Sequence, residues 1–283
     1  MVPSDHVLRA VSLDGGFRVI AAVTTDTVNG AIQSQQARGP IAHRLADLVT
    51  GAVLVRETMA PDLRVQVILS DGKRNRLVAD AMPEGLTRAL VQLPAGSTPA
   101  MLDTMNQLTV MRSLHNGALA TGTVQLTPGR PIAEALMEYF RASEQVASFV
   151  AVGVRLEADK LVSAAGYVVQ LLPEVTEAPL QLMTERLDKF DDITTLLANT
   201  GANPKSVLER LLEGIPHDQV GENPVRYGCN CSEERLLTSL ATISKADLAE
   251  MIAASEVLEI ACDYCRKEYK IAPDLLRGLL SNN

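Results

Sequence analysis

The sequence predicts an α+β fold in three parts. We expect a mixed sheet-and-helix domain over residues 1–173, a helical connector over 174–225 and a small cysteine-bearing domain over 226–283. Three observations carry this prediction. Short apolar segments bounded by turn residues fill the first part, and helical patterns interrupt them. Clusters of Asn, Gly and Pro separate amphipathic stretches in the second part. All four cysteines lie in the last fifth of the chain.

A β-hairpin is the first element that the sequence predicts. Apolar segments at 6–13 and 17–24 flank Asp14-Gly15-Gly16, which is a strong turn sequence. Residues 63–69 alternate between apolar and polar side chains, as a half-buried strand does. Further strands are expected at 75–81, 86–93, 106–112, 118–126, 149–156 and 161–172.

Two helices are predicted between these strands. Pro40 opens a stretch to about Met59 whose apolar residues recur at helical spacing, and Pro131 opens another that ends near Ser143. Runs of strands with helices between them favour an α+β fold over a doubly wound parallel sheet. Ser143-Glu144-Gln145, at the end of the second helix, is expected to cap and hydrogen-bond rather than to catalyse.

The connector is predicted to contain two helices that lie on the first domain. Asn203 is a suitable N-cap for a helix that begins at Pro204 and stops at Gly214. Irregular breaks are expected at 199–203 and 214–226. An earlier amphipathic helix carries an apolar stripe made of Leu180, Met183, Leu187, Phe190, Ile193 and Leu197.

The cysteines form two tight pairs. Cys229 and Cys231 make a CxC sequence, and Cys262 and Cys265 make a CxxC sequence. Four thiolates around one ion describe a closed tetrahedral zinc site, so we expect one Zn²⁺ per chain held by these four residues. The same thiols are the part of the chain most easily oxidised. Cysteines that serve only as small buried side chains would be scattered instead.

The residues around the cysteines predict a small domain that needs a metal. Ser232 is a good helix N-cap, and Ser244 with Asp247 resembles a capping box. Strand-like segments at 257–262 and 268–272 place the CxxC at the tip of a hairpin. A domain this small has a marginal core, and zinc binding supplies on the order of 10–16 kcal/mol of apparent folding free energy.

Composition argues against several other classes of protein. The net charge of −8, and a tail with seven Lys/Arg against nine Asp/Glu, disfavour nucleic-acid binding. No phosphate-binding glycine motif is present, so no cofactor-binding residue is assigned. The histidines (His6, His43, His115 and His217) show no metal-ligand spacing.

The start of the chain bears on its compartment. Met1-Val-Pro-Ser-Asp5 begins no signal sequence, and no apolar run approaches the roughly 18 residues that span a membrane. We therefore expect a cytoplasmic protein with no membrane partner, where paired cysteines are typical of metal-binding or redox-active sites rather than of a disulfide framework.

The cysteine spacing resembles that of the redox-regulated 33 kDa chaperonin family, the heat-shock holdases. The segment Tyr227-Gly-Cys-Asn-Cys-Ser-Glu-Glu-Arg235 is similar to the first cysteine pair of that family. Tyr139-Phe-Arg-Ala-Ser-Glu-Gln145 resembles its Tyr-Phe-x-x-Ser-Glu-Gln signature, and Ala164-Ala-Gly-Tyr-Val-Val-Gln-Leu-Leu-Pro173 resembles its Ala-Gly-Gly and Gln-Leu-Pro segment. The resemblance covers most of the chain, with departures at 71–75 and at Ala165.

The resemblance implies a chaperone that uses no ATP, is not an enzyme, and is homodimeric when active. In the reduced form it holds zinc and is largely inactive. Oxidants convert the cysteines to two disulfides and release zinc, the metal domain unfolds, the connector loosens, and unfolding client proteins bind. We expect near neighbours to pair, Cys229 with Cys231 and Cys262 with Cys265, because thiolates that close need little backbone motion.

Two other functions fit parts of the sequence. A thiol–disulfide oxidoreductase also uses CxxC, but that motif then lies in a βαβ unit and needs no second pair. A constitutive zinc-ribbon interaction module would keep its metal and its fold under mild oxidant. Catalytic reduction of insulin would favour the first, and failure to suppress aggregation would favour the second.

Overall fold

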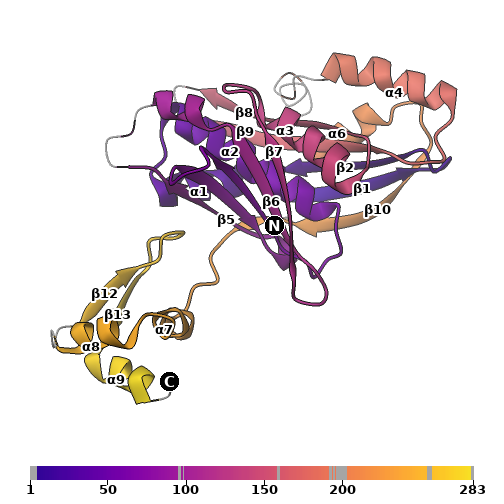
Figure 1. Ribbon diagram of the computed structural model, residues 1–283. Helices are drawn as coiled ribbons and strands as arrows, with labels where there is room; N and C mark the ends of the chain where they lie inside the picture. The colour runs from indigo at the N-terminus through magenta and orange to yellow at the C-terminus, as the bar shows by residue number, and fades with distance from the viewer. Residues whose placement is uncertain are drawn as a thin grey trace. The chain divides into compact units, whose positions relative to one another are not determined.

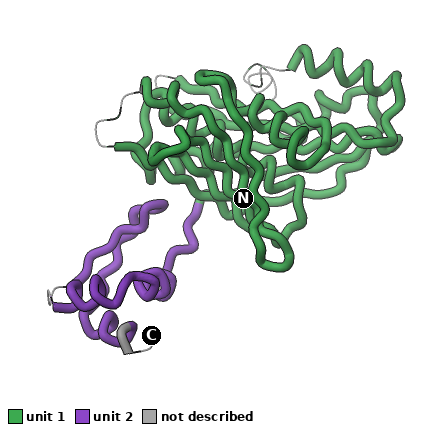
Figure 2. The backbone as a smooth tube through the Cα atoms, in the orientation of Figure 1, with its two compact units in different colours: residues 1–227 green, residues 228–283 purple. Residues whose placement is uncertain are grey.

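The computed structural model describes residues 5–94, 97, 99–157, 160–190, 193, 195, 203–253 and 257–281. The chain divides into two compact units, residues 1–227 and residues 228–283 (Figure 2). The predicted α+β class is confirmed, since both sheets and helices are present throughout (Figure 1). No helix within these ranges is long and apolar enough to cross a membrane.

The first unit contains a five-stranded antiparallel sheet in the order β10-β1-β2-β9-β8. The predicted hairpin at Asp14 is confirmed, because β1 and β2 pair on either side of it. The strands are β1 (His6–Ser12), β2 (Phe17–Val23), β8 (Ser148–Glu157), β9 (Lys160–Leu171) and β10 (His217–Pro224).

The same unit contains a six-stranded sheet in the order β11-β5-β4-β3-β6-β7, in which only the short β11 is parallel to its neighbour. Short 3₁₀ turns occupy 83–85 and 99–104. The expected strand positions are confirmed within about two residues. The strands are β3 (Val65–Ser70), β4 (Arg76–Ala81), β5 (Leu86–Gln92), β6 (Gln107–Ser113), β7 (Leu119–Gln125) and β11 (Arg226–Tyr227).

Helix α2 (Gly39–Glu57) is the centre of this unit. It packs on strands of both sheets, and its residues from Leu45 to Glu57 are almost all buried. An apolar helix of this kind, with buried residues on every side, is typical of a position between two layers. Helix α3 (Ile132–Tyr139) packs against α2 and continues into a π-helical turn at 140–144. Both predicted helices are therefore confirmed.

Helix α1 (Thr25–Gln35) was not predicted. Val28 and Ala31 are its fully buried apolar residues, and polar residues make up most of the rest of the helix. The helical spacing of apolar residues is therefore weak. Its N-terminus is held from a distance, since the Thr27 amide donates to the Asp5 carboxylate at 2.6 Å. A cap that lies 22 positions away along the chain leaves no local sequence signal.

Two connector helices cover the face of the five-stranded sheet that turns away from α2. Helices α4 (Glu177–Phe190) and α6 (Pro204–Leu211) bring Met183 and Val207 into a second core cluster with residues of β1, β2 and β9. The predicted cap is confirmed, because the Lys205 amide donates to Asn203 Oδ1 at 2.9 Å. Met183, Leu187, Phe190 and Ile193 of the predicted stripe therefore pack on the first domain. Leu180 is exposed, and Leu197 lies outside the described residues.

The expected irregular break at 214–226 is wrong. Residues 217–224 form β10, which pairs with β1 along its whole length. Its sequence shows no apolar alternation, because the strand lies at the edge of the sheet and most of its side chains are exposed. Backbone hydrogen bonding to β1, rather than side-chain burial, makes this segment a strand. The last part of the expected connector thus belongs to the sheet of the first unit.

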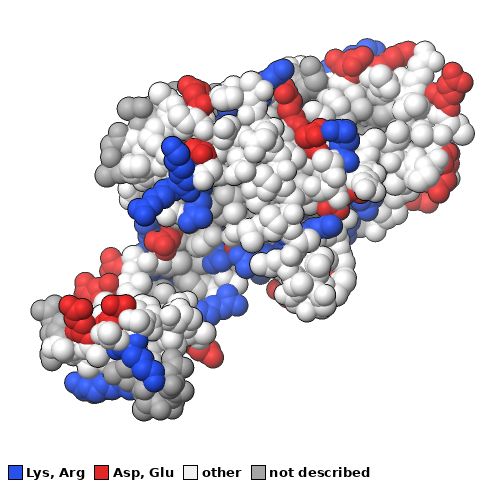
Figure 3. Space-filling view, viewed as in Figure 1, with Lys and Arg blue, Asp and Glu red and all other residues white. Residues whose placement is uncertain are grey.

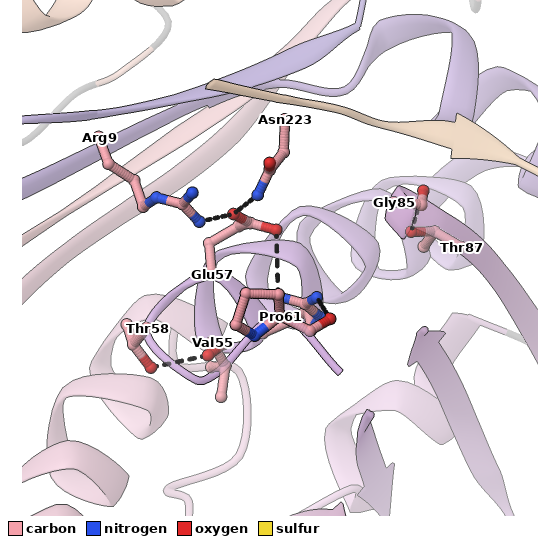
Figure 4. A network of polar contacts seen from close by, with 9 residues as sticks. Arg9, Val55, Glu57, Thr58, Pro61, Gly85, Thr87 and Asn223 are labelled. Atoms are coloured by element: carbon pink, nitrogen blue, oxygen red, sulfur yellow. Dashed lines mark hydrogen bonds and ion pairs between the residues drawn. The ribbon is translucent and has the colours of Figure 1, made fainter. Parts of the chain in front are cut away.

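A buried ion network joins β10 to β1 and α2 (Figure 4). The Glu57 carboxylate accepts from the Arg9 guanidinium at 2.6 Å and from the Asn223 side-chain amide at 2.8 Å. Arg56 lies 3.4 Å from the other Glu57 oxygen. The Glu57 side chain is only 3% exposed, so its charge is compensated by these partners rather than by water.

The second unit is a small bundle around one hairpin. Its elements are α7 (Glu233–Leu240), α8 (Lys245–Ala253), β12 (Leu258–Ala261), β13 (Glu268–Ile271) and α9 (Pro273–Ser281). Ser232 caps α7 as predicted, since its hydroxyl accepts from the Arg235 amide at 3.2 Å. The hydroxyl of Ser244 likewise accepts from the Asp247 amide. Helix α9 has no counterpart among the predicted elements.

We predict that Glu57→Ala lowers the free energy of unfolding of the first unit by about 3 kcal/mol or more, because the buried Arg56 and the half-buried Arg9 lose their carboxylate. Chemical denaturation followed by circular dichroism measures the change. Glu138→Ala is the matched control, since it removes an exposed carboxylate paired with Arg141 and should have little effect. Equal effects of the two substitutions would contradict a structural role for the network.

Candidate metal centre

The four cysteine sulfurs form one cluster. They all lie within 4.8 Å of one another, and none is in a disulfide. The Cys229 and Cys262 sulfurs are 3.8 Å apart, and the Cys231 and Cys265 sulfurs are 3.4 Å apart. The fold therefore brings together the two pairs that the sequence separates by thirty residues.

Two different local structures present these thiols. Cys229 and Cys231 lie on the extended segment that leads into α7, where the Ser232 cap fixes the start of the helix. Cys262 and Cys265 lie at the tip of the β12–β13 hairpin, as the sequence predicts. The Cys262 amide donates to the Lys267 carbonyl at 2.9 Å, and this bond closes the tip.

Backbone and side-chain donors surround the sulfurs. Burial raises the pKa of Cys262 above the ordinary thiol value, and hydrogen bonds from the Cys265 and Tyr264 amides oppose that rise. The Tyr269 hydroxyl donates to the Cys231 sulfur at 3.1 Å. Donors aimed at sulfur stabilise a thiolate, which is the form that binds metal.

The pKa values of the cysteines diverge, because burial and the hydrogen bonds within the cluster act differently on each thiol. Burial alone would raise the pKa of Cys231, but hydrogen bonds from Tyr269 and from the other three cysteines lower it to about 7. Burial raises the pKa of Cys265 to about 12, and hydrogen bonding with Cys231 and Cys262 raises it as well. The Cys231 thiol therefore ionises most readily, while Cys265 keeps its proton and donates to it. A divalent cation would favour four thiolates together.

The sulfur positions fit a tetrahedral zinc ion. Zinc–sulfur bonds of about 2.3 Å place the sulfurs about 3.8 Å apart at tetrahedral angles. The two measured separations and the upper limit of 4.8 Å are compatible with that arrangement. Four sulfur ligands leave no open position for a substrate, so the donor set fits a structural site rather than a catalytic one.

Within the described ranges, the four cysteines form one candidate metal site. No second group of His, Cys, Asp or Glu there has the geometry of a metal site. Glu144 accepts from Tyr139 and Arg112, which confirms the hydrogen-bonding role expected of this segment. On the face shown in Figure 3, acidic and basic side chains both lie on the second unit.

The Tyr269 hydroxyl was missed by sequence reasoning. Tyr269 is one of the buried residues of the second unit. Its hydroxyl contacts Cys231, which lies 38 positions away in the sequence. An aromatic residue on the second strand of the hairpin, four positions after Cys265, was the available signal.

Comparison with known proteins places the chain in a family. The model of the Hsp33 protein family matches residues 5–272, which is nearly the whole chain and includes all four cysteines. This chain belongs to the Hsp33 family. The 33 kDa chaperonin of Syntrophotalea carbinolica is 35% identical to it over 289 residues, covering 98% of this chain and 99% of the relative.

More distant relatives agree with this assignment. The 33 kDa chaperonin of Listeria welshimeri is 30% identical, with 98% of both chains covered. The crystal structure of the 33 kDa chaperonin from Thermotoga maritima superposes with a TM-score of 0.81 over 99% of this chain and 98% of its own. At 24% identity, that superposition establishes the shared fold.

We predict that the reduced protein binds one Zn²⁺ per chain and that each single substitution of Cys229, Cys231, Cys262 or Cys265 by Ser weakens zinc binding strongly, since it removes one of four ligands. Metal analysis after gel filtration in reductant measures the stoichiometry. Ser239→Ala, on an exposed turn of α7, is the control and should retain zinc. Zinc-free reduced protein, or full zinc retention in a Cys→Ser variant, would contradict the four-thiolate site.

Proposed function

We propose that this chain is a redox-regulated, ATP-independent holdase that binds unfolding proteins under oxidative stress. The four-thiol cluster inside a unit with a very small core carries the proposal. Membership of the Hsp33 family supports it, since the relatives are named chaperonins. The switch domain of the proposal is 226–283, the connector is 174–225, and the rest of the chain is the core domain.

The second unit has little besides its thiols to hold it together. Its buried apolar cluster consists of Leu240, Leu248, Ile271 and Leu276, with a few half-buried residues around them. A core of this size is marginal for an independent domain. Metal binding to four thiolates supplies on the order of 10–16 kcal/mol, so loss of the metal removes most of the stability of the unit.

Oxidation of the thiols would remove that support. One thiolate of a pair attacks a peroxide oxygen and becomes a sulfenic acid, while the O–O bond breaks and hydroxide leaves. Its neighbour attacks the sulfenic sulfur, the S–S bond forms, and a second hydroxide leaves. Formation of each disulfide consumes one peroxide, which accepts two electrons from the two thiolates. Disulfide sulfurs no longer carry the negative charge that a zinc site requires.

Unfolding of the switch domain would then act on the connector. Helix α4 is loosely held, because Met183 is the buried side chain among its described residues and Leu180 is 38% exposed. Helix α6 is held more firmly by Val207, Leu208 and Leu211. Release of these helices uncovers the outer face of the five-stranded sheet, including Phe17 and Val19. An exposed apolar surface of this extent binds unfolded chains.

Strand β10 sets a limit to this release. It is hydrogen-bonded to β1 and joined to α2 through Asn223 and Glu57. We therefore expect α4 and α6 to loosen before β10 does. The proposal further includes a homodimer as the active form and unfolding proteins as the partners.

We predict that peroxide produces the Cys229–Cys231 and Cys262–Cys265 disulfides, because each pair shares one short backbone segment and closes with little motion. Peptide mapping of the oxidised protein without reduction tests this. The cluster also allows cross-pairs, since the Cys231 and Cys265 sulfurs are 3.4 Å apart. A majority of cross-paired peptides would contradict the prediction.

The holdase proposal is tested by three measurements on the same sample before and after peroxide with mild heat: zinc content, suppression of aggregation of a thermally unfolded client, and hydrogen exchange. We predict zinc loss, onset of suppression, and loss of amide protection over 226–283 and in α4 and α6. The core domain, with its own buried helix, keeps its protection.

Unchanged protection in the switch domain while aggregation suppression appears would contradict the proposed mechanism. Catalytic turnover of insulin disulfides by the reduced protein would favour an oxidoreductase. Zinc retention without any suppression of aggregation would favour a constitutive zinc module.

A further inference from the structure

The phenol of Tyr269 is a side-chain donor within the sulfur cluster. Its hydroxyl donates to Cys231 Sγ at 3.1 Å. Tyr269 lies on β13, after the second cysteine pair, whereas Cys231 belongs to the first pair. The residue as a whole is 8% exposed. The Ile260 backbone of β12 pairs with Tyr269 and holds it in register. A single oxygen atom can therefore be removed from this contact while the packing of the ring is kept.

A hydrogen bond to a thiolate changes its chemistry in two ways. It stabilises the charge on sulfur, which keeps the thiolate available as a ligand, and it withdraws electron density from the lone pair that attacks an oxidant. Groups that hydrogen-bond to metal ligands orient those ligands and tune the metal site, and their loss typically costs about 10-fold or more in affinity. For Cys231, both effects favour the reduced, metal-bound state.

We propose that Tyr269 is a positioning residue of the redox switch, whose hydroxyl orients the Cys231 thiolate toward the metal and retards its reaction with peroxide. This inference rests on the proposed zinc site and adds a residue that sets the threshold of the switch. Loss of the hydroxyl makes the Cys231 sulfur a better nucleophile: it attacks the peroxide oxygen, the O–O bond breaks, and hydroxide leaves as the sulfenic acid forms.

The nearby Lys267 has a separate role. Its ammonium group lies 5.0 Å from the centre of the Tyr269 ring, over its face. A cation there contributes to the packing of the ring without touching the hydroxyl. Lys267→Met therefore alters the surroundings of Tyr269 while leaving the bond to Cys231 in place, and it serves as the matched control for Tyr269→Phe.

The test uses the full-length reduced protein loaded with Zn²⁺, with release followed by a chromogenic chelator after addition of peroxide. Tyr269→Phe should release zinc on the order of tenfold faster than the unchanged chain, and Lys267→Met should release it at the unchanged rate. Site-specific replacement of Tyr269 by difluorotyrosine, which keeps the ring and strengthens the O–H donor, should slow release. Equal rates for the Phe variant and the unchanged chain would overturn the proposal.

Cobalt substitution gives a readout that a purely structural role would not move. In the Co²⁺-loaded protein, loss of a donor to sulfur shifts the thiolate-to-cobalt charge-transfer band to lower energy. Tyr269→Phe should show this shift and Lys267→Met should not. The band is observed whether or not the protein suppresses aggregation, so the two proposals fail separately. An unshifted band in the Phe variant overturns the role of Tyr269, and a protein with no thiolate band overturns the metal site itself.

Discussion

The convergence of four sulfurs within 4.8 Å is the constraint on which the second unit depends. The segment before α7 begins the unit, the β12–β13 hairpin lies further along the chain, and a cluster of four buried apolar residues accompanies them. Burial, together with hydrogen bonding to Cys231 and Cys262, raises the pKa of Cys265 to about 12. A cation among the sulfurs would favour their ionised forms. In the proposed switch, the same proximity would let an oxidant convert the thiols into disulfides. Support by a metal and sensitivity to oxidant would then have one physical origin.

The first unit is built on a different principle. Its stability comes from α2, buried between two sheets, and from the apolar residues that both sheets direct at it. Within the same unit, the outer face of the five-stranded sheet is covered by α4 and α6. In the proposed mechanism, release of these two helices would uncover this face.

The signature that resembles the family, Tyr139-Phe-Arg-Ala-Ser-Glu-Gln145, has a structural explanation. The Glu144 carboxylate accepts from the Tyr139 hydroxyl at 2.5 Å and from Arg112 at 2.8 Å. Gln145 takes a left-handed conformation that ends the π-helical turn. A side chain at Gly122 would come within 2.5 Å of the Ser143 hydroxyl oxygen. These contacts dock the end of α3 on β6 and β7, so the motif serves packing within the first unit.

The sequence by itself determined the α+β class, the hairpin at Asp14, most strand positions, helix α2 and the four candidate ligands. Each has a local signal: turn residues, alternation, helical spacing, or the CxC and CxxC spacings. Tertiary structure alone decided α1, whose cap is the distant Asp5, and β10, which is a strand because β1 lies beside it. It also decided the contact of Tyr269 with Cys231. In all three cases the stabilising partner is far away in the chain, and a sequence pattern records only what neighbouring residues do to one another.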